Sequence, residues 1–175
     1  MTQLDTPDQA LAYLAEIDPN TAYEVLPFEM GWICSPILTP EEAVGSEAVG
    51  STKLVIDSQT GVVMEFPSWS TEMVAEDYLE AKRTGRPPPA RQIWPHQWRI
   101  TMQRIREDPQ SIMYRMTAVS LNNPPEPAQD HPVTIDKRTL LNDPPDTLSS
   151  VARAHAVQLA QQNQGAWPQE TTTEF

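Results

Sequence analysis

Several features that would assign the chain to a structural class are missing. Cys34 is the only cysteine, which excludes a scaffold held together by internal disulfides. No run of about 18 apolar residues occurs, so we expect no transmembrane helix. The opening segment, MTQLDTPDQA, is polar and acidic and lacks the apolar stretch of a signal peptide. We therefore expect a soluble, cytoplasmic protein.

Motifs for catalysis and for metal or cofactor binding are also missing. The three histidines do not lie at zinc-ligand spacing from one another or from Cys34, and no glycine-rich phosphate loop is present. Cys34 follows Trp32 and Ile33 in an apolar run, which favours a buried thiol over a Cys/His nucleophile. We expect no cofactor, no metal and no enzymatic activity. An enzyme with an unrecognised carboxylate site is the alternative, because paired carboxylates are abundant.

Basic residues are scarce in the first half of the chain, whereas in the second half they nearly balance the acidic residues. The net charge is −12, with four basic against fifteen acidic residues in residues 1–90 and eight against nine in the rest. An acidic surface repels nucleic-acid phosphates, so we expect no nucleic-acid partner. It attracts basic proteins and accelerates their association, although acidity can also serve solubility alone.

Proline is abundant, with 18 residues against only six glycines. Eight of the prolines form clusters at residues 87–89, 124–127 and 144–145, which are typical of stiff connectors. We predict one domain over residues 1–86 and a proline-linked extension over residues 87–175. For the tail, residues 168–175, disorder is favoured over an edge strand.

Local patterns predict an α+β fold built from an antiparallel sheet of hairpins and about three helices. The halves form either two lobes or one extended domain. Helices are predicted after Thr6, with a Thr-x-x-Gln capping box and a stop at Asp18, after Ser70, ending at Gly85, and after Asp146 or Ser149. The predicted strands are 22–28 and 30–37, a hairpin over 51–67, a hairpin over 98–120 and a short strand at 133–135.

The second predicted helix carries the main candidate binding surface. Glu72, Glu76 and Glu80 are spaced i, i+4, i+8 and repel one another, which suggests an external cation or a basic partner. Trp69 precedes this helix and could anchor a partner, although core packing and an ordinary solvated face are the alternatives. The candidate partner-binding residues are Glu41, Glu42, Glu47, Trp69, Glu72, Glu76, Asp77 and Glu80.

A family resemblance covers residues of about 4 to 86. It rests on Met30-Gly31-Trp32-Ile33, on the hairpin Gly50-Ser51-Thr52-Lys53-Leu54-Val55-Ile56-Asp57 with Thr60-Gly61-Val62-Val63, and on Ser68 and Tyr78 after it. This stretch resembles the immunity protein 35 family, also described as YrhB-like. Gly50-Ser51 stands where the family usually has Gly-Asn, and residues 87–175 extend beyond the usual family length.

The resemblance implies a function as well as a fold. Family members are small bacterial cytosolic proteins inferred to neutralise secreted polymorphic toxins, or to act as chaperone-like partners. We therefore expect a non-enzymatic immunity protein that blocks a basic toxin through an acidic surface. The alternative is a chaperone or adaptor for a secreted or assembled client. Neither requires a membrane, and the proline-rich composition is compatible with an actinobacterial source.

Overall fold

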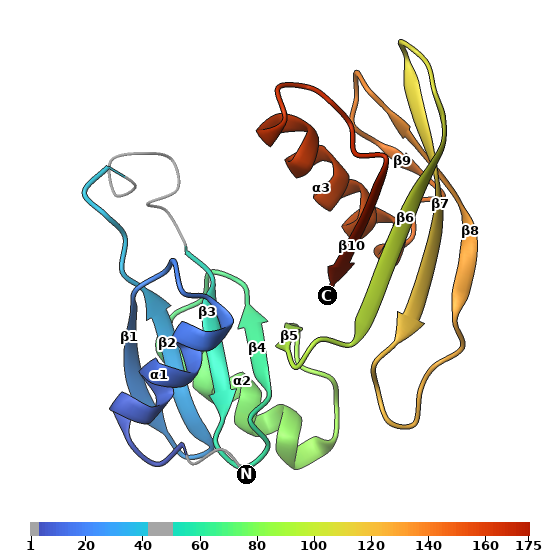
Figure 1. The fold of residues 1–175 in the computed structure, drawn as a ribbon. Helices are drawn as coiled ribbons and strands as arrows, with labels where there is room; N and C mark the ends of the chain where they lie inside the picture. The colour runs from blue at the N-terminus through green and yellow to red at the C-terminus, as the bar shows by residue number, and fades with distance from the viewer. Residues whose placement is uncertain (1–3, 42–50) are drawn as a thin grey trace. The chain divides into compact units, whose positions relative to one another are not determined.

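The computed structural model describes residues 4–41 and 51–175, and they fold as two compact units, Met1–Pro95 and His96–Phe175 (Figure 1). Each unit has its own five-stranded antiparallel sheet, so the two halves do not share one. The three helices and two sheets confirm the predicted α+β class. The division falls at Pro95, because a strand that follows the first proline cluster joins the first sheet.

The first unit is a meander, in which strands that follow one another in the chain are neighbours in the sheet, in the order β1-β2-β3-β4-β5. Its elements are α1 (Pro7–Ile17), β1 (Tyr23–Phe28), β2 (Gly31–Pro36), β3 (Lys53–Asp57), β4 (Val63–Phe66), α2 (Thr71–Thr84) and β5 (Arg91–Trp94).

Helix α1 begins as the sequence predicts. The Thr6 hydroxyl accepts a hydrogen bond from the Gln9 backbone N–H, and the Gln9 side chain accepts one from the Thr6 backbone N–H. Pro7 occupies the first turn, where a missing N–H costs nothing, and Asp18 caps the C-terminal end.

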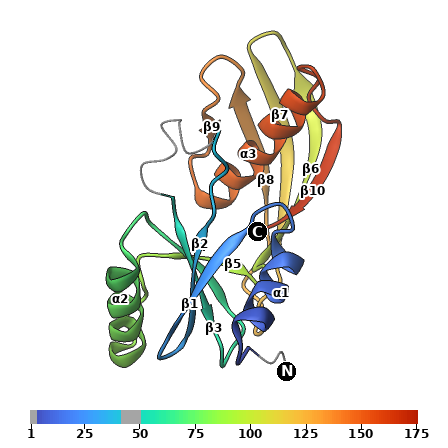
Figure 2. The ribbon, with the colours of Figure 1, turned by 90° about the vertical axis from the view of Figure 1, so that its left-hand side faces the viewer.

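The two helices of the first unit pack on opposite faces of its sheet (Figure 2). Side chains alternate along β2 and β3, so neighbouring residues enter different cores. Trp32 and Cys34 pack in the cluster that contains Leu14 of α1, whereas Ile33 packs in the cluster that contains Tyr78 of α2. Burial on both faces explains why these strands are continuous apolar runs.

The second unit places one helix on one face of its sheet, whose strand order is β10-β6-β7-β8-β9. Its elements are β6 (Trp98–Glu107), β7 (Ser111–Ser120), β8 (Gln129–Asp136), β9 (Asn142–Asp143), α3 (Thr147–Gln162) and β10 (Glu170–Glu174). Its core combines alternate residues of β6, β7 and β8 with Leu148, Ala152 and Ala156 of α3.

Three local predictions were wrong or incomplete. The tail, for which disorder was favoured, forms strand β10 along β6, so the edge-strand alternative is correct. The predicted strand 133–135 is the C-terminal part of the longer strand β8. The third helix, for which the sequence left Asp146 and Ser149 open as N-cap, is capped by Asp146.

Within residues 4–41 and 51–175, no helix is long and apolar enough to cross a membrane. The same residues contain no group of three His, Cys, Asp or Glu side chains placed to hold a metal ion.

Candidate functional site

Helix α2 is anchored at both ends, and this fixes which face it exposes. The Ser70 hydroxyl accepts a hydrogen bond from the Met73 backbone N–H, and Gly85 ends the helix in the left-handed conformation at φ 74°. Val74, Tyr78 and Ala81 are buried against the sheet. The opposite face therefore presents the intervening polar residues to solvent.

A groove of about 270 Å³ runs along the exposed side of α2. Trp69 forms its apolar end; it is half-buried, and its ring packs at a tilt against Phe66 with 6.2 Å between the ring centroids. Met73 lies in the first turn of the helix and is 51% exposed, an unusual position for a large apolar side chain in a polar helix face. The carboxylates of Glu76, Asp77 and Glu80 line the rest of the groove.

The carboxylates of this groove differ in how far the chain itself neutralises them. Arg86, just beyond the helix, contacts Asp77 at 2.5 Å and Glu80 at 3.3 Å. These contacts raise the pKa of the guanidinium above its ordinary value, Asp77 contributing most. Glu76 makes no ion pair or hydrogen bond with any residue that the structure describes. Glu76 therefore carries the least compensated charge of the groove.

The structure brings together four of the predicted partner-binding residues, namely Trp69, Glu76, Asp77 and Glu80. Glu72 lies in the first turn of α2 outside the groove, and its pKa is lowered mainly by backbone hydrogen bonding at the helix start. Glu41 follows β2 and is exposed, and it is not among the residues that line the groove. Glu42 and Glu47 lie outside the described residues.

Sequence reasoning missed two members of this surface. Met73 had a signal, because it follows the N-cap on the side of the helix that does not carry Val74 and Tyr78. Arg86 had none, because its contact with Asp77 spans nine residues and depends on the chain reversal at Gly85.

Behind α2 lies a buried charge cluster centred on Asp57, which is 1% exposed. Its carboxylate accepts hydrogen bonds from the backbone N–H groups of Gln59 and Thr60, at 2.9 and 3.1 Å. It also accepts one from the Tyr78 hydroxyl at 2.8 Å and pairs with Lys82 at 2.8 Å. The cluster ties the β3–β4 hairpin to α2.

A pocket of about 370 Å³ adjoins this cluster between α2, β4 and the chain after Gly85. Its two cationic side chains, Lys82 and Arg86, are each paired with a carboxylate of the chain. The pocket therefore offers no uncompensated charge to a ligand. We assign the cluster a structural role.

The residues considered for nucleophilic chemistry are buried structural groups. Cys34 is fully buried, and burial raises the pKa of its thiol to about 12. Ser149, His131 and Asp146 lie close together, but Ser149 is fully buried and donates its hydroxyl proton to Asp146 at 2.7 Å. Asp146 is the N-cap of α3, so this trio closes a helix end.

Comparison with known protein families gives a match over the first part of the chain. No curated protein and no solved structure matches the chain. The model of the immunity protein 35-like domain matches residues 8–86, which run from α1 to the end of α2 and include the groove. The resemblance inferred from the hairpin and its flanking motifs is thereby confirmed over residues 8–86.

Proposed function

We propose that the chain is a non-enzymatic immunity protein whose first unit binds a protein toxin and blocks it. The observation that carries the proposal is the immunity protein 35-like domain over residues 8–86. The groove along α2 lies inside this domain and is the proposed contact surface.

Charge supports a basic toxin as the partner. The first unit, residues 1–95, holds five basic against fifteen acidic residues, whereas the second holds seven against nine. A net charge of −10 on one small unit creates a negative field that speeds encounter with a basic surface. Toxins that act on nucleic acids or nucleotides need basic clefts, so an acidic protein can occupy the place of the phosphate substrate.

The groove fits a lysine or arginine side chain of such a partner. The aliphatic stem would pack on Trp69 and Met73, and the charged head would reach Glu76. A cation bound here would interact both with the face of the aromatic ring and with the unpaired carboxylate. Asp77 and Glu80 are already held by Arg86 and would form the rim.

Capture of the partner from a lysate of the source cells tests the proposal. The tagged full chain is loaded at low salt and eluted at high salt, and each eluted protein is then expressed alone. One basic protein that is released by salt and toxic by itself supports the immunity role. Many apolar clients retained at high salt would support the chaperone alternative and contradict the proposal.

The groove itself is tested with a matched pair of charge reversals. Glu76→Lys reverses the charge of the unpaired carboxylate in the groove. Glu16→Lys makes the same charge change at an exposed position of α1, the helix that packs on the other face of the sheet. We expect Glu76→Lys to weaken toxin binding about tenfold more than Glu16→Lys. Equal losses would mean that total charge and not the groove determines binding.

A further inference from the structure

The two sheets have four edge strands, and three of them are poor templates for a further strand. Strand β1 contains Pro27, β5 has four residues between the prolines at 87–89 and Pro95, and β9 has two residues before Pro144. Strand β10 differs, because it has five residues, no proline, and an unbroken register with β6 (Figure 2). Among the described edges, β10 alone has no such protection.

The register shows which backbone groups β10 presents at its open side. Phe175 and Trp98 exchange two hydrogen bonds of 2.9 Å, so they form a hydrogen-bonded pair. Such pairs alternate along an antiparallel ladder with pairs whose N–H and C=O groups point away from each other. Glu170, Thr172 and Glu174 are therefore the residues whose backbone groups point away from β6, toward the edge.

The edge is already ordered by contacts to its neighbours. On the face of the sheet opposite α3, Thr172 shares a hydrogen bond of 3.1 Å with Thr101, and Glu174 pairs with Arg99 at 2.8 Å. On the other face, Thr171 contacts His155 of α3 at 2.9 Å. A strand that is held in this way loses little conformational entropy when another strand pairs with it.

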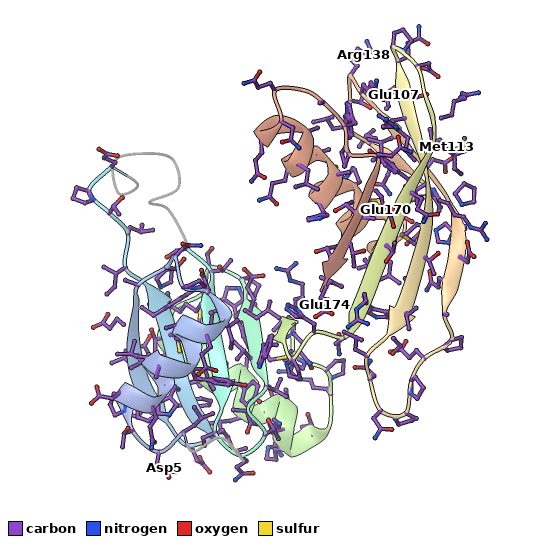
Figure 3. All side chains as sticks on the ribbon, in the orientation of Figure 1. Asp5, Glu107, Met113, Arg138, Glu170 and Glu174 are labelled. Carbon is purple, nitrogen blue, oxygen red and sulfur yellow. The ribbon has the colours of Figure 1, made fainter. Side chains whose placement is uncertain are left out.

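The charges at the two ends of β10 select the occupant (Figure 3). A second copy paired antiparallel about Thr172 would place Glu170 opposite Glu174 of the partner strand at both ends, and like charges directly opposite each other are destabilising. A strand with basic residues at these positions gains two favourable pairs. Glu170 attracts it more, because Glu174 shares its charge with Arg99.

We propose that β10 is a docking edge for an extended, basic segment of a partner protein, which adds to the sheet as an antiparallel sixth strand. The segment carries Lys or Arg two positions before and two positions after the residue opposite Thr172. This interface uses only the second unit and does not depend on the toxin contact proposed for α2.

Synthetic peptides provide the test. The probe is an acetylated, amidated peptide with the core Lys-Thr-Val-Thr-Lys, compared with Glu-Thr-Val-Thr-Glu, and binding to the full chain is measured by fluorescence anisotropy. We expect the basic peptide to bind about tenfold more tightly. Equal affinity or no binding of either peptide would overturn the proposal.

Two variants separate backbone pairing from charge attraction. Thr172→Pro removes an outward N–H without removing a bond to β6, whereas Thr172→Val loses the same hydroxyl but keeps that N–H. We expect Thr172→Pro alone to abolish peptide binding, and Glu170→Lys to reverse the preference toward the acidic peptide. Unchanged binding by Thr172→Pro, or a wild-type dimer that this substitution dissociates, would overturn the assignment.

Discussion

Replacement of Asp57 tests whether its buried carboxylate holds the hairpin and α2 together. Asp57→Ala removes four hydrogen-bond contacts at once and leaves the Tyr78 hydroxyl, on a residue that is 3% exposed, without its acceptor. Loss of one partner of a buried, hydrogen-bonded charge costs about 3–5 kcal/mol. We expect a loss of this size in the free energy of unfolding of the first unit.

Two milder substitutions set a scale for that loss. Asp57→Asn keeps an oxygen for the turn but presents an amide to Lys82, so we expect a cost of about 1–3 kcal/mol. The Lys82 side chain is 43% exposed, and solvent screening limits the cost of Lys82→Met to about 1 kcal/mol or less. The expected order is therefore Asp57→Ala, then Asp57→Asn, then Lys82→Met.

The assay is urea unfolding read by hydrogen exchange in peptides from β3 and α2, so that the first unit is followed separately from the second. Burial alone would raise the pKa of Asp57, but the hydrogen bonds from Lys82 and Tyr78 outweigh it and lower that pKa below 3.8. The unfolded chain then binds the proton more tightly, so this stabilisation is present above about pH 4 and is lost as the pH falls. Wild-type stability in Asp57→Asn, or equal losses in Asp57→Ala and Lys82→Met, would refute this reasoning.

Three further predictions concern other parts of the fold. Gly61→Val should destabilise the first unit by about 1 kcal/mol or more in thermal unfolding, because Gly61 has φ 72° and an added Cβ would lie 3.2 Å from the Tyr13 hydroxyl. Burial lowers the pKa of His155, so the second unit should lose stability as the pH falls below about 6.5, and His155→Gln should flatten that dependence in pH-dependent melting. Cys34 should react with a thiol reagent only on unfolding, and rapid labelling of the native protein would contradict its burial.

Much of the fold was predictable because the local sequence signals for helix starts and stops agree with the pattern of buried apolar residues. The capping box at Thr6 and the stop at Gly85 each act within a few residues, and both are confirmed. An edge strand was the less favoured alternative for β10 because its Thr-rich sequence has no apolar alternation. It is ordered by β6, nearly 70 residues away, with Gln103 opposite Glu170.

The candidate site was only partly predictable for a related reason. The spacing of the glutamates correctly identifies an exposed acidic face on α2, but it cannot reveal how the chain neutralises each charge. Arg86 follows the helix and folds back on Asp77 and Glu80, so the acidic stripe is less uniform than its spacing indicates. Glu80 contacts Arg86 and, one turn along the helix, Arg83 at 3.9 Å, whereas Glu76 has no such contact among the described residues.

Growth rescue tests the central claim, that the groove on α2 blocks a toxin, most directly. The captured partner is expressed in a sensitive host together with the wild-type chain, with Glu76→Lys or Trp69→Ala, or with the control Glu16→Lys, each at a matched soluble level. We predict that the wild-type chain and Glu16→Lys restore growth, whereas the two groove variants do not. Full rescue by both groove variants would contradict the claim.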